Sequence, residues 1–190
     1  MISKNLNIKP ETALFLDRDG VINRRLPGTY VKYVSEFEFL PGVLEAFSIF
    51  AKRFNHIFVV TNQQGIGKGY MNEQELQMVH QYLISEVQAK GGKIDKVYFA
   101  PSLAEENSLM RKPNTGMAIT AKQDFPMIDL SNSFMVGDSV SDMEFGKNAN
   151  MQCIFIHSNT EISVESIPFD LKFDSLIDFA YFVENNTPTL

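Results

Sequence analysis

Short apolar runs alternate with longer amphipathic segments along most of this chain. Apolar runs with the length of buried strands lie at residues 13–16, 57–60, 97–100, 134–136 and 153–156. Segments with helical spacing or helix-starting residues follow them, at residues 43–54, 72–90, 114–125, 139–148 and 175–183. Strands that alternate with helices predict an α/β fold, with a doubly wound, Rossmann-like parallel sheet of about five core strands and flanking helices.

Local signals support the helix over residues 72–90 and the organisation as one domain. Asn72 and Glu75 match a capping box, in which two side chains satisfy free backbone N–H groups at a helix start. Between the first two strands the chain holds only a loop and one helix, which is too little for a large cap domain. The 190 residues therefore predict a single domain, residues 1–190, long enough to bury a real core.

The composition is that of a soluble globular protein, with 44% hydrophobic and 21% charged residues. The formal net charge of −6 argues against nucleic-acid binding and against a basic membrane-surface protein. No apolar run approaches the length of a membrane-spanning helix, and residues 1–10 lack the apolar core of a signal peptide. The one cysteine, Cys153, excludes a disulfide within the chain, so we expect a cytoplasmic protein.

The first apolar run ends at two carboxylates one residue apart, Asp17 and Asp19, followed by Gly20. Residues two apart in an extended segment point to the same side, so these acids would crowd together unless a cation or a proton lies between them. This favours a divalent-metal site at the carboxyl end of a strand, where open α/β sheets place their chemistry. A strand followed by an ordinary Asx-type turn is the alternative.

Three further polar clusters follow predicted strands and favour the first interpretation. They are Thr61-Asn62-Gln63, Arg111-Lys112-Pro113 and Gly137-Asp138. Since the carboxyl ends of parallel strands meet at one edge of the sheet, all four clusters are expected there. Asp17, Asp19 and Asp138 offer the hard oxygen ligands that suit Mg²⁺. Lys112 adds a positive charge, and the Thr61 hydroxyl and the amides after it could bind phosphate oxygens.

A phosphoryl group is what such a site would hold, because Mg²⁺ and Lys112 can neutralise its charge as it is transferred. Asp17 emerges directly from the strand and is the better-placed nucleophile, which would give an aspartyl-phosphate intermediate. Asp19 would then donate a proton to the leaving oxygen and later accept one from the attacking water.

Four motifs, in order, resemble those of the haloacid dehalogenase superfamily of phosphatases. The residues that carry the resemblance are 15–23 (Phe-Leu-Asp-Arg-Asp-Gly-Val-Ile-Asn), 61–63, 111–113 and 137–142 (Gly-Asp-Ser-Val-Ser-Asp). Asp-Arg-Asp-Gly together with Thr-Asn-Gln and Arg-Lys-Pro is similar, more narrowly, to the heptose 1,7-bisphosphate phosphatases and the related histidinol-phosphate phosphatases. The similarity runs from about residue 13 to residue 156.

The resemblance implies that Asp17 is the nucleophile and Asp19 the general acid and base. It also implies a Mg²⁺ ion bound by Asp17, the main-chain carbonyl of Asp19 and Asp138. Asp142, one helical turn after Asp138, would not bind the metal itself but would help to position Asp138. Thr61 would help to hold the transferred phosphoryl group.

The resemblance gives Lys112 the same phosphoryl-holding role as Thr61. Asn62 and Arg111 would face the substrate, and Gln63 is expected among the substrate-binding amides. Arg24 and Arg25 follow the first motif in a loop that must overhang the site. Contact with the substrate and plain solvation at the surface are both open for this pair.

The chain departs from the resemblance at two places. Heptose bisphosphatases commonly carry a zinc loop of three cysteines and one histidine before the Arg-Lys-Pro motif. Residues 100–110 contain neither residue type, so no structural zinc is expected. Ser139 also stands where heptose enzymes often have lysine, which removes one positive charge near the site. Both departures bear on the substrate more than on the chemistry.

The leading prediction is a Mg²⁺-dependent phosphatase of a small phosphorylated sugar, heptose 1,7-bisphosphate cleaved at the 7-position. Basic residues near the site suit a second anionic group. Histidinol phosphate, which carries an ammonium group, is the alternative substrate. Acidic residues in the overhanging loops could pair with this ammonium group. These residues are Glu36, Glu38, Glu105 and Glu106.

An open site also leaves room for a nucleotide or a nucleic-acid 3′-phosphate, although the acidic balance argues against a polymer. A catalytically inactive relative that binds a phosphorylated metabolite is the hypothesis from another class. It predicts the loss of an essential residue, and Asp17, Asp19, Lys112 and Asp138 are all present. An open site needs no partner subunit, so we expect a monomer.

Overall fold

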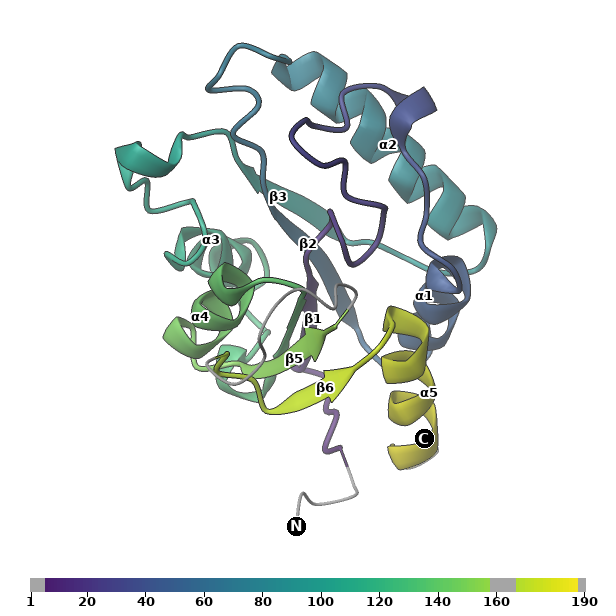
Figure 1. Ribbon diagram of the computed structural model, residues 1–190. Helices are drawn as coiled ribbons and strands as arrows, with labels where there is room; N and C mark the ends of the chain where they lie inside the picture. Colours follow the sequence, from purple (N-terminus) through teal and green to yellow (C-terminus); the bar gives the residue numbers. More distant parts are fainter. Residues whose placement is uncertain (1–5, 158–166, 188–190) are drawn as a thin grey trace.

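The computed structural model describes residues 6–157 and 167–187, in which six strands form one parallel sheet (Figure 1). The strands are β1 (Ala13–Leu16), β2 (His56–Asn62), β3 (Lys96–Ala100), β4 (Phe134–Gly137), β5 (Gln152–Ile156) and β6 (Leu171–Phe173). Their order across the sheet is β3-β2-β1-β4-β5-β6. The predicted doubly wound α/β fold is confirmed.

Helices cover both faces of this sheet (Figure 1). The α-helices are α1 (Val43–Ala51), α2 (Glu73–Ala89), α3 (Gly116–Asp124), α4 (Val140–Asn148) and α5 (Leu176–Asn186). Three short 3₁₀ helices lie in the connections, η1 (Val34–Glu36), η2 (Ala104–Glu106) and η3 (Leu130–Asn132). Buried side chains of α1, α2 and α5 share one core cluster with the sheet, and those of α3 and α4 belong to clusters on the other face. No helix in the described ranges is both long and apolar enough to cross a membrane.

Strand β1 shows why its sequence reads as an unbroken apolar run. Leu14 and Leu16 pack into the core beneath α1 and α5, whereas Ala13 and Phe15 pack into the core beneath α3. All four are fully buried, because successive side chains of a strand point to opposite faces and both faces are covered. At the end of the strand the Asp17 N–H donates to the Val136 carbonyl at 2.9 Å. This bond holds Asp17 at the carboxyl end of β1, beside β4.

The predicted helix start at Asn72 is confirmed. The Asn72 N–H donates to Glu75 Oε2 and the Glu75 N–H donates to Asn72 Oδ1, both at 2.9 Å. The sixth strand, β6, was not predicted. It has only three residues, and Lys172 between its two apolar residues is exposed, so the sequence shows no apolar run there.

Strand β1 lies at the centre of the sheet, between β2 and β4. From β1 the chain adds β2 and β3 on one side and then returns to add β4, β5 and β6 on the other. Open α/β sheets bind ligands at such a reversal, outside the carboxyl ends of the strands. The four polar clusters follow β1, β2, β3 and β4, so the topology brings them to this one edge.

Candidate active site

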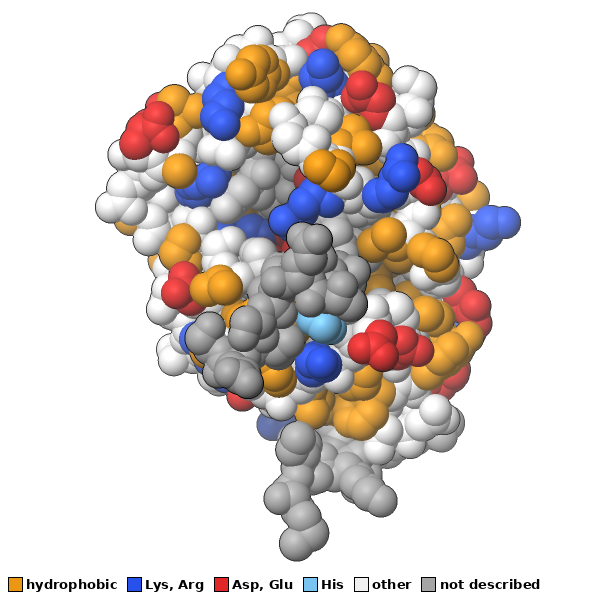
Figure 2. All heavy atoms as spheres, viewed as in Figure 1, with side chains coloured by type: hydrophobic (Ala, Val, Ile, Leu, Met, Phe, Trp, Pro, Cys, Tyr) orange, Lys and Arg blue, Asp and Glu red, His pale blue; other side chains and the backbone are white. Residues whose placement is uncertain are grey.

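A cavity of about 220 Å³ opens at the carboxyl edge of the sheet. Asp17 reaches it from the end of β1, Thr61 from β2 and Lys112 from the loop between β3 and α3. Asn62 and Arg111 also line it. Lys and Arg side chains border the hollow visible in the space-filling view (Figure 2). The structure therefore brings these sequence-predicted residues together.

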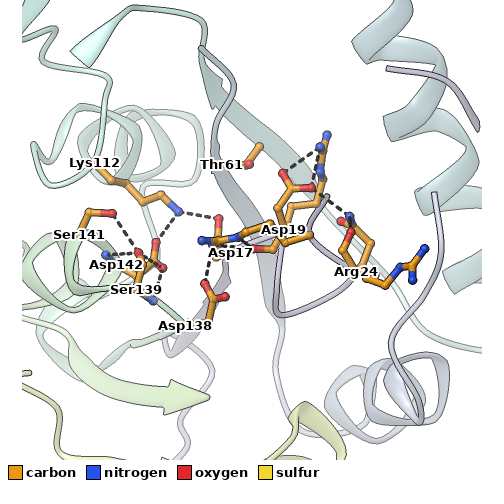
Figure 3. Close-up of polar contacts among 12 residues, drawn as sticks. Asp17, Asp19, Arg24, Thr61, Lys112, Asp138, Ser139, Ser141 and Asp142 are labelled. Carbon is orange, nitrogen blue, oxygen red and sulfur yellow. Dashed lines mark hydrogen bonds and ion pairs between the residues drawn. The ribbon is translucent and has the colours of Figure 1, made fainter. Parts of the chain in front are cut away.

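Lys112 is a buried cation beside Asp17 and Asp142 (Figure 3). Its Nζ lies 2.6 Å from Asp17 Oδ1 and 2.6 Å from Asp142 Oδ1, and it donates to the Val60 carbonyl at 2.7 Å. Burial lowers the pKa of Lys112, but the facing carboxylates of Asp142 and Asp17 outweigh burial and hold that pKa above its usual value. Lys112 is therefore a fixed positive charge beside Asp17.

Three carboxylates gather around this lysine, and Asp17, Asp138 and Asp142 each place one oxygen within 4.8 Å of the others. Burial and the neighbouring Asp142 raise the pKa of Asp17 to about 6. Burial, Asp17 and Asp142 raise the pKa of Asp138 to about 8. These shifts mean that the cluster holds more negative charge than its local cations balance. An oxygen-only cluster in need of positive charge fits a divalent cation such as Mg²⁺.

The closest partners of the Asp142 carboxylate are Lys112 and Ser139. Besides the Lys112 ion pair, its Oδ2 accepts from the Ser139 hydroxyl at 2.6 Å and from the Ser139 N–H at 3.1 Å. Ser139 thereby caps α4, and Asp142 is fixed at the first turn of this helix. Asp142 thus ties the helix to Lys112 while lying in the same acid cluster as Asp138.

Gly20 makes room for the acid cluster. Its backbone has φ of +101°, a conformation that favours glycine. A Cβ atom at this position would lie 1.9 Å from Asp138 Oδ2, which is a steric overlap. The Gly of the Asp-Arg-Asp-Gly motif is therefore required both by the turn and by the close approach of Asp138.

The Asp19 carboxylate takes partners separate from the acid cluster. It accepts from Arg18 Nη2 at 3.0 Å, from Asn23 Nδ2 at 2.9 Å and from Gln63 Nε2 at 2.8 Å. Burial raises the pKa of Asp19, but Arg18 and these hydrogen bonds outweigh it and hold the pKa below its usual value. Asp17 and Asp19 line the same cavity, yet their carboxylates are held by different groups.

The amides after Thr61 position other groups of the site. Asn62 joins β2 to the lysine loop, because its side chain accepts from the Lys112 N–H at 3.0 Å and donates to the Lys112 carbonyl at 3.1 Å. Gln63 is buried, donates to Asp19 and to the Thr61 hydroxyl, and does not line the cavity. The geometry therefore places Gln63 behind Asp19 rather than where a substrate would lie.

The two arginines after the first motif go to different places. Arg24 pairs with Glu38 at 3.0 Å, both of them exposed, and points away from Asp17 and Asp138 (Figure 3). Arg25 lines the cavity and donates from Nη2 to Asp138 Oδ1 at 2.8 Å. Arg24 is therefore a surface residue in contact with solvent, whereas Arg25 is part of the candidate site.

Sequence reasoning missed the buried pair beneath Asp19. Arg18 is fully buried, and its Nη1 lies 3.2 Å from His80 Nε2 on α2. Burial and the Arg18 charge lower the pKa of His80 to about 3, so this imidazole is neutral and can accept from the guanidinium. The only signal for this pair in the sequence is an arginine between two acidic residues. Its partner His80 lies 62 residues further along the chain, so the sequence does not indicate the pairing.

The acid cluster predicts that the metal-free protein loses stability as the pH rises. The folded-state pKa values of Asp138, about 8, and Asp17, about 6, lie above the ordinary value of 3.8. The folded state therefore binds more protons, and the stability from these two groups, complete below the ordinary pKa, is lost as the pH rises through the folded values. We expect the unfolding temperature in EDTA to fall between about pH 5 and about pH 8, and to fall less in Asp138→Asn.

Circular dichroism during heating measures this difference. Asp124→Asn is the control, because Asp124 lies on the exposed side of α3 and outside the cluster. An equal fall in all three proteins would show that the raised pKa values do not govern the stability of the metal-free protein.

The HAD-hydrolase-like family model matches residues 109–169, a range that includes Lys112 and Asp138 of this site. The D-glycero-alpha-D-manno-heptose-1,7-bisphosphate 7-phosphatase of Campylobacter jejuni is 40% identical over 76% of this chain and 81% of its own length. The D-glycero-beta-D-manno-heptose-1,7-bisphosphate 7-phosphatase of Rhodopseudomonas palustris is 33% identical over 73% of this chain and 79% of its own. The chain belongs to this family of HAD-like phosphatases, as the motifs indicated.

A solved structure shows the same fold. The D,D-heptose 1,7-bisphosphate phosphatase of B. bronchiseptica, complexed with magnesium and phosphate, superposes with a TM-score of 0.81. The match covers 92% of this chain and 98% of that one at 23% identity. The match covers nearly all of both chains, so the two proteins share the same fold.

Proposed function

We propose that this chain removes the 7-phosphate of D-glycero-D-manno-heptose 1,7-bisphosphate, with Asp17 as the nucleophile. The observation that carries the proposal is the buried Lys112–Asp17 contact, 2.6 Å long, at the edge of an open cavity and within a cluster of carboxylates. The names of the relatives supply the substrate class, and they include both the alpha and the beta anomer.

In the first step an Asp17 carboxylate oxygen attacks phosphorus, and the bond from phosphorus to the C7 oxygen breaks. Asp19 gives its proton to this leaving oxygen, which leaves the sugar as an alcohol. Water then attacks the phosphorus of the aspartyl phosphate and gives a proton to Asp19. The bond from phosphorus to the Asp17 oxygen breaks, which releases inorganic phosphate and regenerates Asp17. Lys112 and the Thr61 hydroxyl bind the phosphoryl oxygens. When bound by Asp17, Asp138 and the Asp19 carbonyl, Mg²⁺ supplies positive charge against the phosphoryl group.

Asp19 has to hold a proton for the first step, although its partners favour the ionised form. Arg18, Asn23 and Gln63 keep its pKa below the usual value before substrate binds. A bound phosphate group is itself negative and opposes this effect, because a nearby like charge favours the neutral carboxyl. Before substrate binds, Asp19 is therefore in the ionised form, which can accept a proton, and the substrate's own charge supports the donor role.

The second cavity favours a bisphosphate over histidinol phosphate. It measures about 390 Å³ and shares Asp19, Arg25 and Asn62 with the first cavity. Lys68 lines it, and Arg111 lines the first, so positive groups surround the space beyond the phosphoryl site. Neither cavity lining includes any of the four glutamates that could meet an ammonium group. These glutamates are Glu36, Glu38, Glu105 and Glu106.

Three of those glutamates also have other partners, and Glu106 accepts from the backbone N–H of Leu103 at 3.1 Å. Glu38 pairs with Arg24, and Glu36 accepts from the backbone N–H groups of Lys32 and Tyr33. The proposal further includes Mg²⁺ as the metal and a cytoplasmic monomer of one domain. Strand ends of one sheet and the segments that follow them supply the residues that line the cavity, which supports a single domain that needs no partner subunit.

Phosphate release over a substrate panel tests the proposal. The panel contains both anomers of heptose 1,7-bisphosphate, histidinol phosphate, simple sugar phosphates and nucleotides, each with Mg²⁺ and with EDTA. We expect Mg²⁺-dependent turnover that favours heptose bisphosphate by at least about 100-fold in kcat/KM, because a site built to pair with charged groups of its substrate rejects substrates that leave those groups unpaired. A preference for histidinol phosphate would contradict the substrate. Lack of any turnover by folded, Mg²⁺-binding protein would support the inactive, metabolite-binding alternative.

A further inference from the structure

Arg25 makes an unusual set of contacts for a residue on an overhanging loop. Its Nη2 donates to Asp138 Oδ1 at 2.8 Å and to the main-chain carbonyl of Asp19 at 2.9 Å. Its Nε donates to the same carbonyl at 3.2 Å. Arg25 lines the cavity, whereas Asp138, to which it donates, does not. One guanidinium nitrogen therefore joins two oxygens that belong to different strand ends.

These two oxygens are also proposed metal ligands. Asp138 and the Asp19 carbonyl complete the Mg²⁺ site together with Asp17, and the Asp138 carboxylate belongs to the acid cluster. A guanidinium and a divalent cation are both positive, and both satisfy carboxylate and carbonyl oxygens. Arg25 and Mg²⁺ are directed at the same two oxygens, and two positive charges brought this close together repel each other, so the two cations compete for this position.

We propose that Arg25 is an internal competitor for the metal site, whose guanidinium holds the Asp138 and Asp19 oxygens in the metal-free protein and is displaced when Mg²⁺ binds. This inference rests on the proposed function for the identity of the metal ligands. It goes beyond that function by giving the chain a built-in cation that offsets part of the negative charge of the acid cluster before the metal binds.

The surroundings of Arg25 suit this exchange. The Arg25 side chain is 53% exposed, so it can leave without opening the core, while the Asp138 side chain is only 10% exposed. The residue after Asp138 is Ser139, which carries no charge, so the cation that contacts Asp138 comes from the loop. Arg25 also lines the second cavity, of about 390 Å³, which offers space into which the displaced side chain can turn.

Mg²⁺ titration of Arg25→Ala by calorimetry, without substrate, tests the competition. We expect Mg²⁺ to bind about fivefold to tenfold more tightly than in wild type, since a half-exposed arginine no longer has to be displaced. The matched control is Arg24→Ala, which removes the same charge from the neighbouring residue but from a pair with Glu38 outside the cavity. Its Mg²⁺ affinity is expected to equal that of wild type.

Thermal unfolding supplies an independent readout with the opposite sign. In EDTA we expect Arg25→Ala to unfold at a lower temperature than wild type, because the acid cluster loses a cation. In saturating Mg²⁺ the two proteins are expected to unfold at the same temperature. A purely structural role for Arg25 would lower the unfolding temperature under both conditions and would overturn the proposal.

Nitrogen-15 NMR of the arginine side chains follows the displacement directly. The Arg25 Nε–H signal, assigned by its loss in Arg25→Ala, is expected to shift when Mg²⁺ is added, because the bond to the Asp19 carbonyl breaks. Mg²⁺ binding with an unchanged Arg25 signal and equal affinity in Arg25→Ala would overturn this inference alone. Failure of wild type to bind Mg²⁺ would instead contradict the proposed function.

Discussion

Asp17→Asn is expected to abolish phosphate release while leaving the protein folded. Asparagine keeps the size of the side chain but has no carboxylate to attack phosphorus, and removing a nucleophile costs at least about 10⁴-fold in kcat. The fold should persist because the substitution removes one of three crowded negative charges, although it weakens the contact with Lys112. The measurement is phosphate release from heptose 1,7-bisphosphate in Mg²⁺, with circular dichroism on the same sample.

The matched control for this variant is Asp124→Asn. Asp124 lies at the end of α3, pairs with Lys96 and is remote from the cavity. Its activity should equal that of wild type. Retention of more than about a tenth of wild-type kcat by folded Asp17→Asn would rule out Asp17 as the nucleophile.

Lys112→Met is expected to cost both stability and activity. The variant leaves Asp17 and Asp142 buried and facing each other without their shared cation, 2.6 Å from each in the wild-type protein. Removing one partner of a buried ion pair lowers the free energy of unfolding by about 3–5 kcal/mol. Urea unfolding in EDTA would measure this loss. Activity in Mg²⁺ should fall at least about 100-fold, because the transferred phosphoryl group loses a fixed positive charge.

Lys96→Met gives the surface comparison. Lys96 also pairs with an aspartate, at 2.7 Å, but its side chain is 47% exposed, and such pairs contribute about 0–1 kcal/mol. Adding Asp142→Asn to Lys112→Met should restore part of the stability and none of the activity, since it removes the orphaned charge and not the need for a cation. A Lys112→Met protein as stable as Lys96→Met would contradict the buried-triad description.

The sequence was informative wherever a signal was local. The run before Asp17 is buried on both faces, which is why it predicted a buried strand. The capping box at Asn72 needs only residues three apart, and it was found. Strand β6 was missed because its short edge pairing with β5 leaves no apolar run in the sequence. Edge strands of this length are specified by tertiary contacts rather than by pattern.

The site was predictable as a set of residue types at one sheet edge, and less so as a set of contacts. Strand topology places Asp17, Thr61 and Asp138 at this edge without further information. The partners of Arg18 and Arg25 could not be predicted, because His80 and Asp138 are brought to them only by the folded chain. Long side chains on loops have no periodic pattern from which their direction can be read.

The most direct test of the central claim is to trap the reaction on the protein. Wild-type chain is mixed with heptose 1,7-bisphosphate and Mg²⁺, quenched in acid within the first turnover, digested and mapped by mass spectrometry. We predict one phosphoryl group on the peptide that contains Asp17, absent in EDTA and absent from Asp17→Asn. Release of phosphate in the same time with no phosphorylated peptide, or with the phosphoryl group on another residue, would contradict the mechanism proposed for this site.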